Sequence, residues 1–250
     1  MRDHCLIMTE TSHRPWPLSK NLWALAMKWH DLLFMHWPVR VDRLRPLIPS
    51  ALEIDTFDNA AWLGVVPFRM TGIRPRYTPT LPYLSTFPEL NVRTYVKIAG
   101  KPGVWFFSLD AANPIAVQVA RRAFHLPYFD AHMSCVSGGG VTQYQSTRTH
   151  RAAPHANFRG RYQPIGEVFE ATRGSLDKWL TERYCLYAAN RNGRIFRGDI
   201  HHQRWPLQRA EAEIVTNTMT EQLGFELPRT QPLLHFAKQL NVVAWMPKPV

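Results

Sequence analysis

The sequence contains little cysteine, and no two cysteines form a CxxC pair. Cys5, Cys135 and Cys185 are widely spaced among 250 residues. This odd number and low density predict reduced thiols rather than a disulfide framework. Because 45% of the residues are apolar, a chain of this length can bury a sizeable core without disulfides. We expect a single domain over residues 1–250.

Long hydrophobic runs are also missing. The first twelve residues carry Arg2, Asp3, His4 and Glu10, so they lack the apolar core of a signal peptide. The apolar stretch at 22–39 is interrupted by lysine, aspartate, histidine and proline, whereas a membrane-spanning helix needs about 20 mostly apolar residues. We therefore expect a soluble, cytoplasmic protein with no membrane partner.

Runs of like charge are absent, although the net charge is +11. Of the 30 basic residues, 23 are arginines, and these are scattered along the chain. A nucleic-acid footprint needs basic residues clustered on one face, so the sequence favours an arginine-rich surface over a nucleic-acid partner. GxSxG, P-loop, GxGxxG and HExxH motifs are absent, which disfavours serine hydrolases, nucleotide binding and zinc sites. We expect no metal and no cofactor.

Alternating apolar and polar residues are what the sequence does contain. Residues 91–98 alternate, and after the turn 99–103 a second strand runs over 104–109, which predicts a hairpin with a five-residue connection. A second hairpin is predicted from 131–136 and 141–147, joined by the turn 137–140. Residues 194–210 also read as extended.

Helical signals are few. Apolar residues spaced by three and four predict a helix over 18–29, and 40–48 is typical of a short amphipathic turn. Asn113 followed by Pro114 predicts a helix over 114–124, and Ser175 predicts the N-terminus of one over 174–182. Many strands with a few short helices indicate an α+β fold dominated by antiparallel sheet.

Two segments, 41–55 and 113–128, resemble acetoacetate decarboxylase in content and order. A closer resemblance, over nearly the whole chain, is to the YqjF-like family of bacterial proteins. Its hallmarks stand here at 36–37, 61–68, 89–96, 106–111, 126–128, 181–184 and 205–208. This resemblance implies a mostly antiparallel β-barrel of acetoacetate decarboxylase type, with a few short helices and an internal pocket for a small molecule. It implies no particular reaction.

The resemblance fails at the central residue of the decarboxylase. That enzyme carries a lysine directly after the proline of its helix-loop motif, and the lysine forms a Schiff base with the ketone. Here the matching positions hold Tyr128 and Phe129, and a phenol cannot form an iminium. The nearest lysines in sequence are Lys97 and Lys101, and exposure is favoured for Lys97 because lysine is rarely buried. We therefore predict that no Schiff base forms.

Polar residues along one face of a strand provide the candidate site. Arg93 would bind a carboxylate, Glu89 and Tyr128 would transfer protons or donate hydrogen bonds, and one of two adjacent histidines would act as a base. The alternative, in which the Arg93 face points to solvent, stays open. The catalytic candidates are Tyr128, Glu89 and His202, and the substrate-binding candidates are Arg93, Asn91, Tyr95, His36 and Trp62.

Two functions remain after this reasoning. The first is an enzyme that acts on a small organic acid or ketone by acid-base chemistry. The second is a non-catalytic small-molecule binder, either a sensor or a carrier. The sequence leaves the ligand and the formation of a homo-oligomer open.

Overall fold

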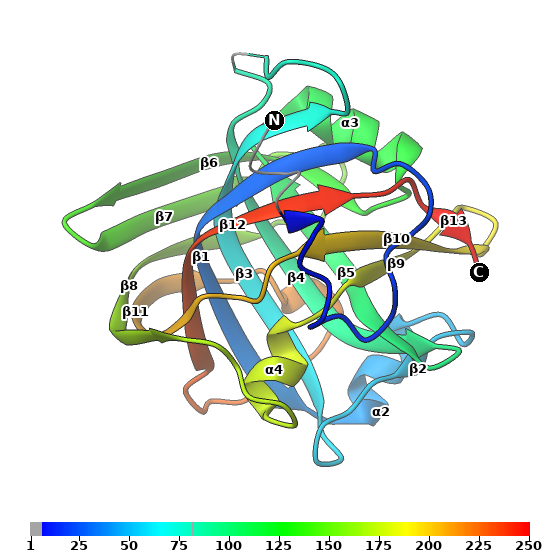
Figure 1. The fold of residues 1–250 in the computed structure, drawn as a ribbon. Coiled ribbons are helices and arrows are strands. Elements are labelled where there is room, and N and C mark those ends of the chain that lie inside the picture. The colour runs from blue at the N-terminus through cyan, green and yellow to red at the C-terminus, as the bar shows by residue number, and fades with distance from the viewer. Residues whose placement is uncertain (1–6, 82) are drawn as a thin grey trace.

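A computed structural model describes residues 7–81 and 83–250, and a thirteen-stranded sheet dominates it (Figure 1). The first six strands are β1 Leu25–Val39, β2 Glu53–Ile54, β3 Ala61–Pro75, β4 Phe87–Ile98, β5 Lys101–Ala111 and β6 Tyr128–Gly138. The others are β7 Val141–Arg148, β8 Asn157–Phe169, β9 Cys185–Ala189, β10 Ile195–His202, β11 Leu207–Asn217, β12 Leu233–Ala244 and β13 Lys248–Pro249. The helices are α2 Val41–Leu44, α3 Pro114–Ala123 and α4 Leu176–Thr181, with 3-10 turns at Arg45–Leu47 and Glu221–Leu223.

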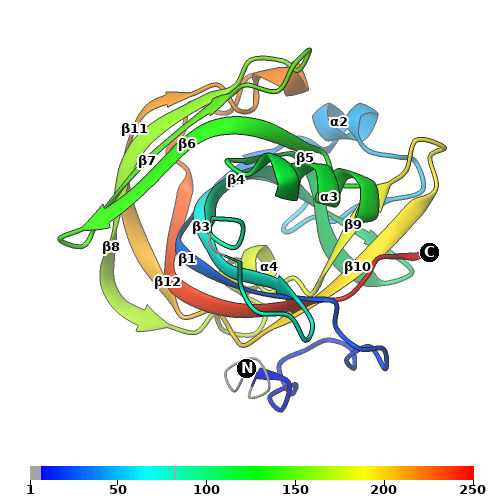
Figure 2. The same cartoon turned by 90° about the horizontal axis from the view of Figure 1, so that it is seen from above.

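The strand pairings form a circuit. From β5 the hydrogen bonding passes through β4, β3, β1, β12, β10 and β9 and returns to β5. A second path leaves β5 through β6, β7, β8 and β11 and also reaches β12. Figure 2 shows the strands of the first circuit around a centre in which α4 is seen. The segment β12–β1–β3–β4–β5 of the first circuit connects the two ends of this second path, so these five strands are shared by two circuits.

The sheet is mixed, which corrects the expectation of an antiparallel arrangement in one respect. The expected dominance of sheet with a few short helices is confirmed. However, β5 pairs in parallel with both β6 and β9, while the other strand pairs described are antiparallel. For the β5–β6 pair the cause is α3, which carries the chain back so that β6 starts beside β5 in the same direction.

Both predicted hairpins are confirmed, but their turns are shorter than expected. Only Ala99 and Gly100 connect β4 to β5, and both have positive φ, at 48° and 72°. This two-residue turn suits the right-handed twist of the flanking strands. Lys101 to Gly103 therefore belong to β5 and not to the turn. Likewise, Gly139 and Gly140 alone separate β6 from β7.

Of the helix predictions, the one over residues 18–29 is wrong. Residues 25–29 begin β1, because they pair with β12 and β3 on either side. The other three predictions are confirmed by α2 with its following 3-10 turn, by α3 and by α4. The side chain of Asn113 accepts a hydrogen bond from the backbone N–H of Ala116, and that of Ser175 accepts one from Lys178.

The shared strands have a buried side chain layer on each face. On β1, Leu33 and Met35 pack in one hydrophobic cluster, and Phe34 packs with Phe68 in another. On β4, the polar residues Glu89 and Asn91 are buried as well. The face of β4 that carries Arg93 is therefore covered at Glu89 and Asn91, and Arg93 itself is half-buried. That this face lines a pocket stays a prediction.

Three further observations concern the remaining expectations. Among the described residues, no helix is long and apolar enough to cross a membrane. Cys135 and Cys185 are free thiols, and Cys5 lies outside the described residues. Lys97 forms an ion pair with Glu53, with 2.9 Å between its Nζ and Oε1, so its ammonium is occupied at the edge of the sheet.

Candidate functional site

The buried carboxyl group of Glu89 is the centre of the candidate site. The Tyr128 hydroxyl donates a hydrogen bond to Glu89 Oε2 over 2.6 Å, although 39 residues separate the two. Burial raises the pKa of Glu89 to about 7, and the nearby charge of Asp110 adds to this, while hydrogen bonds from Tyr128 and Asn91 oppose it. Burial and then the charge of Glu89 raise the pKa of Tyr128 well above its usual value. This pair therefore combines a carboxyl group that titrates near neutrality with a neutral phenol.

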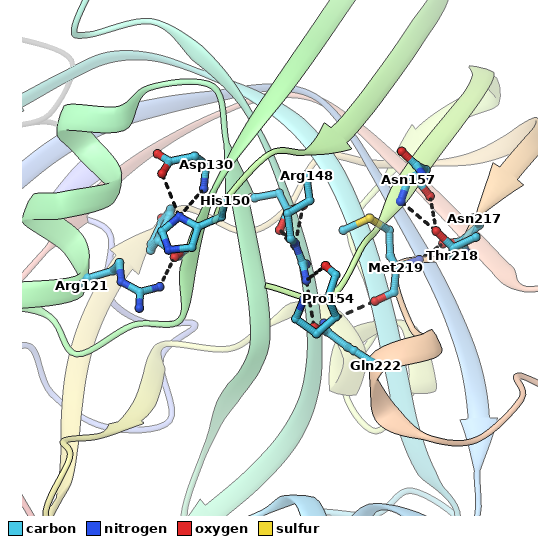
Figure 3. A network of polar contacts seen from close by, with 12 residues as sticks. Arg121, Asp130, Arg148, His150, Pro154, Asn157, Asn217, Thr218, Met219 and Gln222 are labelled. Carbon is cyan, nitrogen blue, oxygen red and sulfur yellow. Dashed lines mark hydrogen bonds and ion pairs between the residues drawn. The ribbon is translucent and has the colours of Figure 1, made fainter. Parts of the chain in front are cut away.

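The backbone brings Tyr128 to Glu89 through the end of α3. The N-terminal residues of β6 pair with the end of β5, with Tyr128 beside Leu109. Arg121, in the last turn of α3, donates a hydrogen bond to the Tyr128 carbonyl oxygen. Nearby, His150 Nδ1 lies 2.8 Å from Asp130 Oδ2 (Figure 3). These contacts fix the start of β6 and with it the position of the phenol.

A second part of the site surrounds Arg93. Its guanidinium carbon lies 5.0 Å from the centre of the Phe34 ring and 5.9 Å from that of the Tyr95 ring. His36 Nε2 and the Tyr95 hydroxyl are 2.6 Å apart, and both side chains are buried. Burial, and then the positive charge of Arg93, lowers the pKa of His36 well below its usual value. His36 is therefore neutral beside a permanently charged guanidinium.

Gly64 allows these groups to come together. A Cβ atom at position 64 would lie 3.2 Å from His36 Cδ2 and 3.3 Å from Arg93 Cγ. His36 in β1 and Arg93 in β4 are both paired with Gly64, from the two strands that flank β3. Their side chains therefore come together over this glycine on one face of the sheet. Sequence reasoning missed Gly64, although a glycine inside an apolar strand is a sign of close approach.

Several buried polar atoms of this region have no hydrogen-bond partner within the described part of the chain. Four belong to residues selected from the sequence: Arg93 Nε, Trp62 Nε1, His36 Nδ1 and Asn91 Oδ1. Trp205 Nε1 and Arg183 Nη2 are also buried without a hydrogen-bond partner. Buried polar groups are nearly always hydrogen-bonded, so such a concentration requires an explanation. Most of these atoms are donors, which favours a ligand rich in oxygen acceptors.

His202 lies in a different part of the interior from the Glu89 pair. Its ring stacks on Tyr184 and contacts Trp205, whose own ring contacts Phe34 at 5.0 Å. His202 Nδ1 is 2.6 Å from the carbonyl oxygen of Gln203. The structure thus brings together Tyr128 with Glu89, and Arg93 with Tyr95 and His36, whereas His202 is connected to the Arg93 group through intervening residues such as Trp205 and Arg183.

Lysines do not supply a buried amine. All seven lysines of the sequence are described, and each is exposed or half-buried. A Schiff-base lysine needs desolvation or a neighbouring cation to lower its pKa. Within residues 7–81 and 83–250, no three His, Cys, Asp or Glu side chains are grouped so as to hold a metal ion. The expectation of a site without a metal or cofactor stays a prediction.

Solved structures define the class of the fold. An acetoacetate decarboxylase-like enzyme from Sphingomonas wittichii RW1 superposes with a TM-score of 0.63 at 12% identity, covering 95% of this chain and 97% of that one. Acetoacetate decarboxylase from Legionella pneumophila gives 0.59 at 11%, covering 96% and 93%. The enduracididine biosynthesis enzyme MppR, in complex with pyruvate, gives 0.61 at 7%, covering 92% of each chain. At these identities the likeness shows the fold alone, which is acetoacetate decarboxylase-like.

The family follows from sequence comparison. The chain belongs to the DUF2071 family, described as an uncharacterized conserved protein, whose model matches residues 26–241. It is 49% identical over 225 residues to the uncharacterized protein YqjF of Bacillus subtilis (strain 168), which covers 90% of this chain and 92% of that protein. The resemblance predicted from the sequence is thereby confirmed.

Proposed function

We propose that this protein is an enzyme that acts on a small organic acid or ketone by acid-base chemistry, without a Schiff-base lysine. We further propose that the circuit of strands is a closed barrel, that the whole chain is one domain, and that the ligand occupies a pocket inside the barrel. The observation that carries this proposal is the group of buried, unpartnered donors around Arg93, on the strand and face that also carry Glu89, whose pKa is raised to about 7.

Arg93 supplies recognition of the ligand. A guanidinium presents several N–H donors in a fixed plane and binds carboxylates through paired hydrogen bonds. Phe34 and Tyr95 lie beside this guanidinium, and the ion pairs found within the described residues do not include Arg93. Pyruvate, which is bound in one structure of MppR, is a suitable probe because it joins a carboxylate to a ketone.

Glu89 supplies proton transfer. With a pKa of about 7, it is mostly protonated below neutral pH and is available there as a proton donor, whereas an exposed glutamate has already lost its proton. Asn91 lies between Glu89 and Arg93 on the same face of β4, so the Cα atoms of Glu89 and Arg93 are about 13 Å apart. The proposal therefore requires these two long side chains to extend toward each other, so that one 2-oxo acid has its carboxylate at Arg93 and its ketone at Glu89.

Proton exchange tests the proposal. Pyruvate is incubated with the protein in D2O, and loss of its methyl proton signal is followed by NMR at several pD values. We expect exchange that decreases above neutrality as Glu89 ionises, and we expect Glu89→Gln to lower the rate about 100-fold, which is a typical contribution of general acid-base catalysis. Glu167→Gln, at an exposed position of β8, is the matched control. Borohydride treatment in the presence of pyruvate should leave every lysine unmodified, and a lysine adduct contradicts the proposed chemistry.

A non-catalytic binder is the second candidate, favoured by the lack of a fully buried lysine. The donors around Arg93 serve a carrier as well as they serve an enzyme. Saturable binding of pyruvate without any exchange, in the wild type and in Glu89→Gln alike, supports the binder and refutes the enzyme.

A further inference from the structure

The side chains of His235, Asp177 and Arg209, from three separate elements, contact one another. Asp177 Oδ1 in α4 lies 2.8 Å from His235 Nε2 in β12, and Arg209 in β11 donates to Asp177 at 2.8 Å and 3.2 Å through its two terminal nitrogens. Arg209 Nη1 is also 2.7 Å from His235 Nε2. The His235 side chain is fully buried, whereas that of Arg209 is 47% exposed. The contacts of His235 with Asp177 and Arg209 are therefore all made through Nε2, and the ion pair between Arg209 and Asp177 lies between the histidine and the solvent.

The other nitrogen of His235 lies on the side of the candidate site. His235 is directly opposite Phe34 in the antiparallel pairing of β12 with β1, and directly opposite residues project from the same face of a sheet. Phe34 contacts Arg93 on that face, and the His235 ring centre is 6.5 Å from that of His36. His235 Nδ1 is buried and has no hydrogen-bond partner within the described part of the chain.

Two groups compete for Nε2 of His235. The guanidinium Nη1 of Arg209 only donates and favours a lone pair on Nε2, whereas the carboxylate of Asp177 only accepts and favours a proton there. The proposal below takes the form in which Nε2 carries the proton, which leaves the lone pair of Nδ1 free to accept another. The Asp177 carboxylate also stabilises the imidazolium that forms. Burial, with Arg209 adding to it, lowers the pKa of His235, and Asp177 opposes this effect. The charged or titratable groups around the ring are Asp177 from α4, Arg209 from β11 and His36 from β1.

We propose that His235 Nδ1 is the proton acceptor of the candidate site and that Asp177 is its positioning residue. This proposal rests on the function proposed above. With pyruvate, the C–H bond of the methyl group breaks and its proton passes to His235 Nδ1. The electron pair of that bond becomes the C=C bond of the enol, and the carbonyl oxygen takes the proton of Glu89. Neutral imidazole and neutral carboxyl group become imidazolium and carboxylate, so charge and atoms balance. The reverse step in D2O returns a deuteron to carbon.

The test measures pyruvate exchange and pyruvate affinity for the wild type, His235→Gln, Asp177→Asn and the control His132→Gln, whose side chain is exposed on β6. We expect His235→Gln to lower the exchange rate about 100-fold or more, with the dissociation constant changed less than about 3-fold. Asp177→Asn should shift the acidic limb of the pH profile to lower pH, because the imidazolium loses its carboxylate. A merely structural role for Asp177 leaves that limb in place. The control should match the wild type.

The outcomes separate this proposal from the one on which it rests. Exchange by the wild type that His235→Gln leaves within 3-fold overturns the role of His235 and leaves the enzyme intact. If the wild type performs no exchange, the enzyme proposal fails, and 15N NMR of the histidine rings decides the placement of Nδ1. A shift of the His235 Nδ1 resonance on adding pyruvate, lost in Arg93→Gln, supports its position in the site. An unmoved resonance overturns that position.

Discussion

Glu89 should make the stability of this protein depend on pH in a defined direction. Its pKa rises from the ordinary 4.5 to about 7 on folding because burial disfavours the charged form. Between these two values the folded state holds the proton that the unfolded chain has released. Raising the pH therefore favours unfolding in this window, and the carboxylate costs the folded state about 3 kcal/mol above pH 7.

The variant Glu89→Gln removes this dependence. Glutamine still accepts the hydrogen bond of the Tyr128 hydroxyl and does not titrate. We expect the free energy of unfolding of the variant to match that of the wild type near pH 4.5 and to exceed it by about 3 kcal/mol at pH 8. With a urea m-value of about 3 kcal/mol/M, the midpoint should shift by about 1 M.

Urea unfolding, followed by tryptophan fluorescence at four pH values between about 4.5 and 8, measures this difference. Glu167→Gln, at an exposed position, should show little dependence on pH relative to the wild type. A difference between Glu89→Gln and the wild type that is constant over the whole range refutes the argument, because it means that Glu89 titrates alike in both states.

Two further substitutions test the packing of the polar interior. Tyr128→Phe removes the donor to Glu89 and should lower the free energy of unfolding by about 1–3 kcal/mol. Because this hydrogen bond lowers the pKa of Glu89, the loss of stability with rising pH should continue to a higher pH in this variant. Arg148→Met leaves the buried carboxylate of Asp110 unpaired, since both side chains are at most 1% exposed, and should cost about 3–5 kcal/mol in chemical unfolding. Arg161→Met, in an ion pair that is 66% exposed on the arginine side, should cost less than about 1 kcal/mol, and equal losses for the two arginines contradict this reasoning.

Much of the fold could be predicted from local patterns. The alternation along 91–98 predicted β4, and Asn113 with Pro114 predicted α3, because these signals act over a few residues. Residues 18–29 misled because their apolar spacing fits a helix, whereas pairing of Leu25 with Ala244 and Pro75 makes the end of that segment a strand. Such distant pairings leave no trace within the segment itself.

The candidate site was predictable in part for the same reason. Arg93, Asn91 and Tyr95 lie on one strand, so their common face could be read directly. His235 was missed because its partner Asp177 is 58 residues away. A lone histidine in the apolar stretch 233–237 was the only signal, and on its own it does not distinguish a functional group from a packed one.

The central claim is that buried donors around Arg93 bind a small carboxylate. Isothermal titration of the wild type and of Arg93→Gln with pyruvate, at a pH near 6.5, tests this claim most directly. We expect saturable binding by the wild type and an affinity lower by about 30-fold or more in the variant, because truncating one member of a buried charge pair costs at least about 2 kcal/mol. Equal affinities of the two proteins, or no heat of binding in the wild type, contradict it.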